Sequence, residues 1–386
     1  MDNVKIGIIG IGGMGGNHAE NIFAKNIQGM TLTAVADINP ERLTWAKDKF
    51  GNDFACFESG SELIKSGLVD AVIIATPHYF HPVFSIEGLQ NGLHVLTEKP
   101  VGVYTKQITE VNKTAEKSGL VYCAMFNQRT HHLYRKMREI VQSKELGEMK
   151  RSNWIITDWY RSQSYYDSGS WRATWGGEGG GVLLNQCPHN LDLWQWICGM
   201  PKKVTAFCHE GKWHDIEVED DVTAYVEYEN GATGVFVTST ADCPGTNRFE
   251  IMFDKGKLVC ENDELTLYKL TQSEREFNKT YKDGFGQPEH EIIKVETDGI
   301  ALHHTGILQN FANAILNNEP LIANGTEGIL GLSISNAMHL SSWTGKMVKF
   351  PIDHDLFLSE LNKRIENSTV KKAQGSVMDV SGTFGV

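Results

Sequence analysis

The sequence predicts an α/β protein with an N-terminal doubly wound parallel sheet and a C-terminal α+β domain that contains a large, mostly antiparallel open sheet. A chain of 386 residues exceeds the size at which one hydrophobic core keeps growing, so two domains are expected. Short apolar runs alternate with amphipathic helical stretches up to about Asn127, and longer strands of alternating polarity follow. We therefore expect domains at residues 1–127 and 128–353, followed by a C-terminal tail at 354–386.

Five runs in the first part are almost entirely apolar, as strands are when helices cover both faces of their sheet. They are VKIGIIG (4–10), TLTAVAD (31–37), AVIIAT (71–76), HVLTEK (94–99) and VYCAMFN (121–127). Helical stretches lie between them, such as Pro40 to Lys49, where Asn39 is suited to the N-cap and Pro40 to the first helical position. Right-handed βαβ units on a parallel sheet follow from this order.

The second part contains runs with the two-residue period of half-buried strands. They are SNWIITDWY (152–160), DVTAYVEYEN (221–230), GATGVFVTST (231–240) and FEIMFDKGKLVC (249–260). Asn230 and Gly231 accept the positive φ angles of a tight hairpin turn, which predicts antiparallel pairing. Helices near Thr305–Asn317 and Glu327–Thr344 are expected to close this domain. The tail from about His354 is polar and then rich in glycine and serine, so it is either a subunit-docking arm or a loosely ordered segment.

Composition excludes several classes of partner. The formal net charge of −12 disfavours nucleic acids and anionic membranes. No apolar run is long enough to cross a bilayer, no signal peptide opens the chain, and seven scattered cysteines are expected to be reduced thiols, so we expect a cytoplasmic protein. The adjacent pairs His131-His132 and His303-His304 have no carboxylate cluster at ligand spacing, so no metal is expected.

The first strand leads directly into a glycine-rich turn and a helix. The turn contains Gly10, Gly12, Gly13, Met14 and Gly15 and reads G-x-G-x-x-G, the dinucleotide-binding pattern of a Rossmann domain in its required context. Gly10 permits the tight turn, Gly12 leaves room for the pyrophosphate and Gly15 allows close packing of helix on strand. These residues predict a dinucleotide cofactor.

Asp37 ends the second strand at about the 20-residue offset where an acid binds the adenosine ribose, so NAD is favoured over NADP. Asp37 could instead be a simple turn residue. Arg42 could meet a 2′-phosphate, but a solvated helix face is the favoured interpretation. Thr76 and His78 follow the strand at 71–76 and are expected near the nicotinamide ribose, as is Asn127 after the last run. His81 has the same role or caps the following helix.

The strand at 94–99 ends in Thr97-Glu98-Lys99-Pro100, again at a carboxyl edge of the sheet. Pro100 biases Lys99 towards an extended conformation, which directs its side chain. A partly buried lysine beside the nicotinamide hydrogen-bonds the reacting oxygen and stabilises alkoxide character. Glu98 would orient it, and both Glu98 and Lys99 are also expected among the cofactor contacts.

A second motif runs from Gly179 to Asp192 and reads GGGVLLNQCPHNLD. With the glycine-rich turn and Glu98-Lys99-Pro100, it makes the chain resemble the Gfo/Idh/MocA family of sugar and inositol dehydrogenases, whose third signature is G-G-G-x-L-x-D-x-G-x-H-x-x-D. The likeness covers residues 4 to 352. It implies an NAD-dependent oxidoreductase in which Lys99 and His189 act as the catalytic pair, His189 taking the substrate proton.

The third signature also departs from the family pattern. Asn185 stands where the family usually has aspartate, and Pro188 stands in place of a glycine before the histidine. An amide cannot accept a proton, yet Asn185 keeps hydrogen-bonding capacity for a substrate hydroxyl. Asn185 and His189 are four residues apart and are expected to share one helix face. Asp192 could orient the imidazole or face the loop below, and His189 could itself be purely structural.

Residues 158–181 are rich in aromatic and guanidinium groups, which suit a sugar ring because its C–H face stacks on aromatic rings. We predict that Tyr160, Arg161, Trp171 and Arg172 bind substrate, although such rings serve equally well in a core or interface. The expected substrate is a sugar, a glycoside oxidised at C3 to a keto-glycoside, or an inositol. A glycosidase that uses transient oxidation is the alternative, and a non-catalytic NAD-binding regulator is a third. A homo-oligomer is expected, because a wide sheet with an exposed face usually has a symmetric mate.

Overall fold

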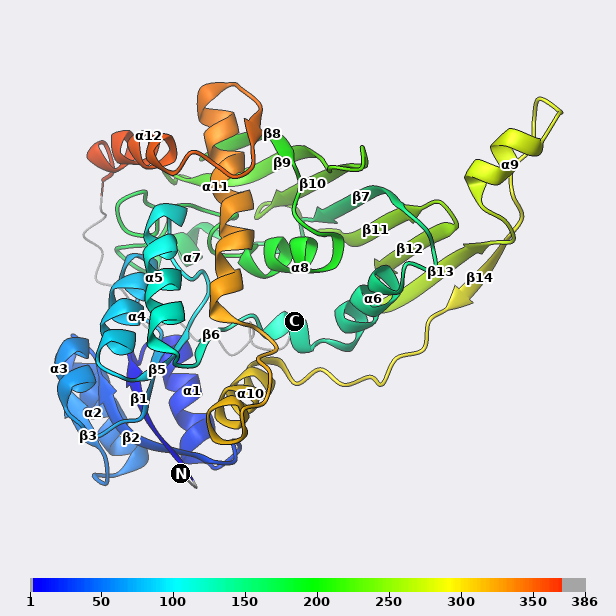
Figure 1. The fold of residues 1–386 in the computed structure, drawn as a ribbon. Coiled ribbons are helices and arrows are strands. Elements are labelled where there is room, and N and C mark those ends of the chain that lie inside the picture. The colour runs from blue at the N-terminus through cyan, green and yellow to red at the C-terminus, as the bar shows by residue number, and fades with distance from the viewer. Residues whose placement is uncertain (1–2, 370–386) are drawn as a thin grey trace.

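The computed structural model describes residues 3–369 and contains two sheets (Figure 1). The first is a six-stranded parallel sheet in the order β3-β2-β1-β4-β5-β6. Its strands are β1 (Val4–Ile9), β2 (Met30–Ala36), β3 (Ala55–Phe57), β4 (Ala71–Ile74), β5 (His94–Thr97) and β6 (Tyr122–Ala124). The doubly wound N-terminal sheet is thus confirmed.

The predicted strands of this sheet form because helices cover both faces. All four residues of β4 are buried, and Ile6 and Ile8 in β1 are fully buried. The strand β3 was not predicted, because it is a three-residue edge strand whose residues are only half-buried. The associated helices are α1 (Gly13–Phe23), α2 (Pro40–Phe50), α3 (Gly60–Lys65), α4 (His81–Gln90) and α5 (Thr105–Ser118), with short 3-10 turns η1 (His78–Phe80) and η2 (Asn127–Thr130). Asn39 caps α2 as expected, its side chain accepting a hydrogen bond from the Glu41 N–H.

The second sheet has nine strands in the order β14-β13-β12-β11-β7-β10-β9-β8-β15. They are β7 (Met149–Ile156), β8 (Lys203–Glu210), β9 (Glu219–Glu227), β10 (Thr233–Ser239), β11 (Asn247–Phe253), β12 (Gly256–Glu261), β13 (Glu264–Leu270), β14 (His290–Lys294) and β15 (Val348–Lys349). Only the β7–β10 pair is parallel, so the mostly antiparallel sheet is confirmed. The β9–β10 hairpin is also present, but only Gly231 of the predicted pair has a positive φ, at 83°.

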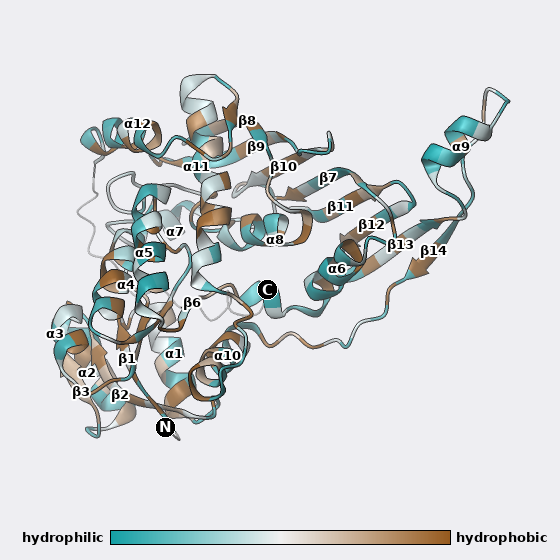
Figure 2. Ribbon diagram, in the orientation of Figure 1, coloured by the Kyte–Doolittle hydropathy of each residue, from teal (hydrophilic) through white to brown (hydrophobic). Residues whose placement is uncertain are grey.

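Helices cover one face of the nine-stranded sheet (Figure 1). The helices of this part are α6 (His132–Ser143), α7 (Gln163–Asp167), α8 (Pro188–Cys198), α9 (Glu274–Thr280), α10 (His303–Asn317), α11 (Gly328–Thr344) and α12 (His354–Glu366), with a 3-10 turn η3 (Gly325–Glu327). Figure 2 shows hydrophobic residues concentrated in the strands of the N-terminal sheet, whereas α9 is hydrophilic on a projecting arm. Within residues 3–369, no helix is long and apolar enough to span a membrane.

One expectation about the C-terminal part is wrong, and one of the two alternatives for the tail, loose order, is excluded for residues 354–366. The helix α10 packs against the N-terminal sheet rather than closing the second domain, and Gln309 Oε1 accepts a hydrogen bond of 2.8 Å from the Gln28 N–H. The first part of the tail is an ordered helix, α12, because Asp353 caps its N-terminus and Phe357 and Leu361 are buried. The remainder of the tail, from residue 370, lies outside the described residues.

A buried ion pair joins the end of the N-terminal sheet to the second unit. Arg129 in η2 donates two hydrogen bonds to Asp192 in α8, of 2.7 and 2.6 Å, and also contacts Glu327 in η3. Arg129 and Asp192 are each 1% exposed. Asp192 therefore anchors α8 through hydrogen bonds with Arg129 and Gln195, a role that neither of the two alternatives considered for it describes.

Candidate active site

One cavity of about 560 Å³ lies where the carboxyl ends of β1, β2, β4 and β5 meet loops of the second unit. Most residues predicted for cofactor or substrate line it: Gly10, Gly12, Gly13, Met14, Asp37, Thr76, His78, His81, Glu98, Lys99, Asn127, Arg161, Trp171, Arg172, Asn185 and His189. The fold thus brings together residues that are up to about half the chain apart in sequence.

The glycine-rich turn is shaped by close backbone contacts. Gly10 has a φ of 84°, and a Cβ there would lie 2.7 Å from the Ala75 carbonyl oxygen. A Cβ on Gly15 would lie 1.8 Å from the Gly10 carbonyl oxygen, so only glycine allows the start of α1 to pack this closely on the turn. A Cβ on Gly12 would meet no atom within 4 Å. Gly12 therefore keeps open the space in which a dinucleotide phosphate would meet the N-terminus of α1.

Asp37 lies at the end of β2 and holds this turn. Its Oδ2 accepts a hydrogen bond of 2.8 Å from the Ile11 N–H, and its Oδ1 accepts one of 2.9 Å from the Asn39 N–H. Each oxygen keeps a further lone pair for a ribose hydroxyl. The favoured interpretation of Arg42 as a solvated side chain is wrong. Its Nε donates to the Ile11 carbonyl oxygen at 2.7 Å, and its guanidinium stacks 4.1 Å from the centre of the Trp45 ring.

The loop after β4 supplies polar groups at the centre of the cavity. His81 is the first residue of α4 and lines the cavity, but its side chain does not cap the helix, because Nδ1 lies 2.7 Å from the Pro100 oxygen and Nε2 lies 2.6 Å from the Thr76 oxygen. The buried Thr76 Oγ1 and Asn127 Oδ1 have no hydrogen-bond partner within residues 3–369. Unpaired buried polar atoms are costly, so these two atoms fit a site that binds a polar ligand such as nicotinamide and its ribose.

Lys99 reaches across the cavity to the second unit. Its Nζ donates a hydrogen bond of 2.9 Å to the backbone oxygen of Asn185. Burial lowers the pKa of Lys99, and the nearby Glu98 charge opposes that change. We expected Glu98 to orient the Lys99 ammonium group, but its carboxylate instead lies 2.7 Å from His18 Nε2 and accepts a hydrogen bond from the Lys99 backbone N–H. Burial alone would raise the pKa of Glu98, but the hydrogen bond and charge of His18 lower it to about 2.

His189 occupies the first turn of α8 and is 8% exposed. Burial lowers its pKa well below the ordinary value of 6.5, and the Lys99 charge lowers it further. The imidazole is therefore neutral near pH 7, the form that accepts a proton. The prediction that Asn185 and His189 share one helix face is wrong. Because Pro188 begins α8, Asn185 lies in the preceding turn, where its N–H donates to the Gly181 oxygen at 2.9 Å.

Glu178 was missed in the sequence, although it is the lone charge in the run Gly176-Gly177-Glu178-Gly179-Gly180-Gly181. It is 2% exposed, and its Oε1 accepts a hydrogen bond from Asn185 Nδ2. Its Oε2 accepts one of 2.6 Å from the Ala173 N–H, and the Arg172 guanidinium lies 4.0 Å from Oε1. A buried carboxylate thus stands directly behind Asn185.

Aromatic rings form the outer wall of the cavity. Trp159, Tyr165 and Trp171 line it, whereas Tyr160, which was predicted to bind substrate, is 50% exposed and is not among the lining residues. The chain after β7 is irregular, and it places Trp159 on the cavity and Tyr160 towards solvent. The Arg172 guanidinium lies 4.6 Å from the centres of both the Tyr165 and Trp171 rings.

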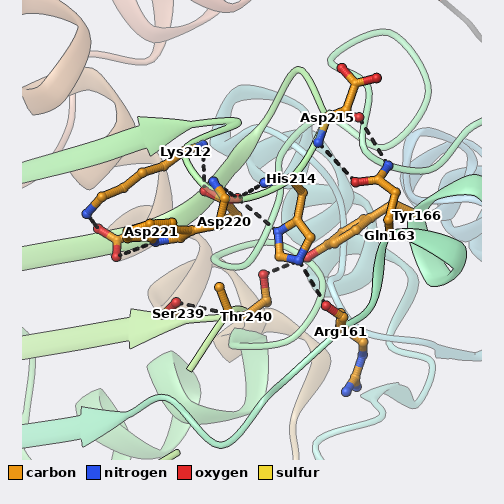
Figure 3. Close-up of polar contacts among 12 residues, drawn as sticks. Arg161, Gln163, Tyr166, Lys212, His214, Asp215, Asp220, Asp221, Ser239 and Thr240 are labelled. Atoms are coloured by element: carbon orange, nitrogen blue, oxygen red, sulfur yellow. Dashed lines mark hydrogen bonds and ion pairs between the residues drawn. The ribbon is translucent and has the colours of Figure 1, made fainter. Parts of the chain in front are cut away.

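A polar cluster behind the wall holds the Arg161 backbone (Figure 3). The buried Asp220 accepts hydrogen bonds from three consecutive backbone N–H groups at 212–214 and lies 2.9 Å from His214 Nδ1. His214 Nε2 lies 2.9 Å from the Arg161 oxygen, and the Arg161 N–H donates to Thr240. The backbone that presents Arg161 is therefore fixed on both sides.

The described part of the chain contains no group of three or more histidine, cysteine or acidic residues arranged to hold a metal ion. All seven cysteines are free thiols.

Comparison with known proteins shows which family the chain matches. Residues 4–126 match the family described as "Oxidoreductase family, NAD-binding Rossmann fold", and residues 134–259 match the "GFO/IDH/MocA C-terminal domain". The chain is 24% identical to a myo-inositol 2-dehydrogenase of Thermotoga maritima, over 90% of this chain and 98% of that protein. It is also 24% identical to a levoglucosan dehydrogenase of Pseudarthrobacter phenanthrenivorans, over 80% of this chain and 88% of that protein.

A solved structure has the same fold. The WlbA dehydrogenase from Bordetella pertussis, in complex with NADH and UDP-GlcNAcA, superimposes with a TM-score of 0.78 at 23% identity, covering 91% of this chain and all of that one. The matched family, the glycine-rich turn and the open space at Gly12 agree on the cofactor, which is NAD. The chain belongs to the Gfo/Idh/MocA family of NAD-binding oxidoreductases.

Proposed function

We propose that this chain oxidises a secondary hydroxyl of a sugar, glycoside or inositol and transfers the hydride to NAD. One observation carries the proposal: Lys99, Asn185 and His189 line the same cavity as the glycine-rich turn and Asp37. The names of the relatives, an inositol dehydrogenase and a levoglucosan dehydrogenase, support a polyol or sugar as substrate.

The proposed roles follow from charge and burial. NAD, when bound, supplies the carbon that accepts the hydride. The neutral imidazole of His189 takes the proton of the reacting hydroxyl, because its lowered pKa leaves it unprotonated. The Lys99 ammonium stabilises negative charge on the same oxygen while the ketone forms. Asn185 accepts a hydrogen bond from a neighbouring hydroxyl of the substrate.

The aromatic wall supports a substrate with an apolar face. Trp159, Tyr165 and Trp171 offer rings for the C–H face of a sugar, and the arginines among them offer donors for its hydroxyls. The same rings accommodate an aromatic aglycone, so we propose oxidation of a glycoside at C3 to a keto-glycoside as the specific form of the reaction.

The test is a substrate panel. The purified protein is incubated with NAD and myo-inositol, D-glucose, methyl β-D-glucopyranoside or phenyl β-D-glucopyranoside, while NADH absorbance and product mass are followed. A dehydrogenase accumulates NADH and a product lighter by two hydrogens. Release of phenol without net NADH would instead identify a glycosidase that works by transient oxidation, and no reaction with any carbohydrate would contradict the proposal.

We also propose a cytoplasmic homo-oligomer. The face of the nine-stranded sheet opposite its helices exposes Ile155, Phe207 and Tyr225, of which Phe207 is 62% exposed, and such a face suits a second copy of the chain. Free thiols suit a reducing compartment. We propose units at residues 1–127 and 128–353, with α10 packed on the first. Sedimentation analysis tests the oligomer: a monomer at micromolar concentration would contradict it.

A further inference from the structure

We propose that Glu178 is a positioning residue that fixes the orientation of the Asn185 amide, so that the Asn185 oxygen faces the substrate. The inference rests on the proposed function, because it concerns how the same site recognises a hydroxyl beside the reacting one. Its basis is a chain of two hydrogen bonds, from the Ala173 N–H to the Glu178 carboxylate and from the Asn185 amide to the same carboxylate.

The Glu178 carboxylate has a fixed place behind the cavity. Its side chain is buried, its own N–H donates to the Thr174 oxygen at 2.9 Å, and its backbone oxygen lies 3.1 Å from His78 Nδ1. The Arg172 guanidinium provides a partial countercharge 4.0 Å away. Burial raises the pKa of Glu178, while Arg172, the Ala173 N–H and the Asn185 amide oppose that rise and favour the carboxylate.

An ionised carboxylate only accepts hydrogen bonds, which decides how Asn185 must lie. Glu178 Oε1 contacts Asn185 Nδ2, so the amide oxygen is directed away from Glu178 and towards the cavity that Asn185 lines. The backbone of Asn185 is held independently, because its oxygen accepts the Lys99 ammonium at 2.9 Å. Asn185 therefore offers the substrate an acceptor in a fixed place beside Lys99.

The Ala173 N–H makes this arrangement testable, because a backbone N–H can only donate a hydrogen bond and so always requires an acceptor facing it. In Glu178→Gln, the new amide must turn its oxygen to Ala173 and its nitrogen to Asn185. Asn185 must then rotate, turn its own oxygen inward and present Nδ2 to the substrate. The isosteric substitution thus replaces an acceptor by a donor in the cavity without changing the shape of the side chain.

The double variant Glu178→Gln, Asn185→Asp restores the acceptor. The introduced aspartate accepts from the nitrogen of the introduced glutamine and keeps its second oxygen for the substrate. Glu217→Gln is the matched control. Glu217 precedes β9 and does not line the cavity, and its carboxylate accepts hydrogen bonds from the Trp175 N–H of the same loop and from Ser368 and Thr369. All variants are compared for kcat/KM with NAD and the panel member that the wild type oxidises fastest, for NADH affinity by fluorescence, and for melting temperature.

The expected result is that Glu178→Gln lowers kcat/KM by about 10- to 100-fold with unchanged NADH affinity, and that the double variant recovers most of the loss. Glu178→Gln also removes a negative charge that raises the pKa of Lys99, so the alkaline limb of the kcat/KM profile moves to lower pH and returns in the double variant. This shift reports the lost charge alone, so the recovery of kcat/KM in the double variant is the readout that a purely structural role for Glu178 would not give.

Wild-type kinetics in Glu178→Gln, or a double variant as poor as the single one, would overturn the inference. If Glu178→Gln melts far below the wild type, the inference is tested by the double variant alone. Recovery of its kcat/KM then supports the inference, and failure to recover contradicts it. A wild-type protein that oxidises no panel member defeats the proposed function itself, whereas an active wild type with an indifferent Glu178→Gln variant defeats only this inference.

Discussion

The two halves of the cavity differ in what they are made of. The cofactor half is formed largely by backbone, with a glycine-rich turn that Asp37 and Arg42 hold from two sides. The substrate half is formed by side chains from the loop between β7 and α8, supported from behind by the buried carboxylates of Glu178 and Asp220. The first half depends on the fixed spacing of one βαβ unit. The second depends on side-chain contacts of an irregular loop, some local, as between Glu178 and Asn185, and some between distant segments, as between His214 and Arg161.

This difference predicts how each half responds to mutation. A side chain added in the cofactor half is expected to act through steric clashes, either with neighbouring backbone, as at Gly15, or with the space left for the cofactor, as at Gly12. A change in the substrate half acts through charge and hydrogen-bond direction, because its polar groups are buried and each has few partners. Lys99 belongs to both halves, since it follows β5 and contacts the Asn185 oxygen.

Lys99→Ala has the largest expected effect. We expect kcat to fall by about 100- to 1000-fold or more, because the variant loses the cation that stabilises charge on the reacting oxygen. NADH affinity, measured by fluorescence titration, is expected to stay within about twofold, since the glycine-rich turn and Asp37 are intact. Normal turnover in this variant would show that the substrate half does not depend on Lys99.

Gly15→Ala and Gly12→Ala separate folding from binding in the cofactor half. A Cβ on Gly15 would lie 1.8 Å from a backbone oxygen, so the free energy of unfolding should fall by about 1–3 kcal/mol. A Cβ on Gly12 would meet no atom within 4 Å, so this variant should melt like the wild type but bind NADH about tenfold or more weakly. Equal melting temperatures for the two variants would contradict the steric account.

Trp159→Ala and Tyr160→Ala test which ring faces the substrate. Trp159 lines the cavity, so its loss should raise KM for the best carbohydrate by about tenfold, the value of one good aromatic contact. Tyr160 is half exposed, so its loss should leave KM unchanged. The opposite pattern, measured by steady-state kinetics, would return Tyr160 to the pocket.

The smallest expected effect is on pH dependence. His189, the proposed base, can accept a proton only when unprotonated, so activity is expected to fall as pH falls through its pKa. Burial and the Lys99 charge lower that pKa below 6.5, so kcat/KM should remain level down to pH 6.5 and decline only in more acidic buffer. An acidic limb centred above pH 6.5 would mean that His189 is not the base.

The same contrast explains what could be predicted from the sequence. The parallel strands were recognisable because both faces of their sheet are covered. Residues such as Ile8 and Ile73 are therefore buried, and each strand is an uninterrupted apolar run. Asp37 and the glycine-rich turn were recognisable because their spacing is set by one βαβ unit. The edge strand β3 lacked such a run and was missed.

The substrate half was harder to predict, because its roles depend on side-chain contacts within an irregular loop rather than on a repeating pattern. Glu178 matters through the Ala173 N–H and the Asn185 amide, which no periodicity reveals, although a single charge within a glycine run is a usable signal. Asn185 was placed on a helix that begins only at Pro188, a residue that commonly occupies the first helical position and so marked the boundary. Tyr160 was preferred to Trp159, because in an irregular segment the sequence does not reveal which of two adjacent rings faces the cavity.

The most direct test of the account is a crystal structure of this protein with NAD and an oxidisable carbohydrate. The account predicts nicotinamide between the loop after β4 and Lys99, with Lys99 Nζ and the His189 imidazole both within hydrogen-bond distance of one substrate oxygen. A dinucleotide bound elsewhere, or two side chains too far apart to contact a common oxygen, would contradict it.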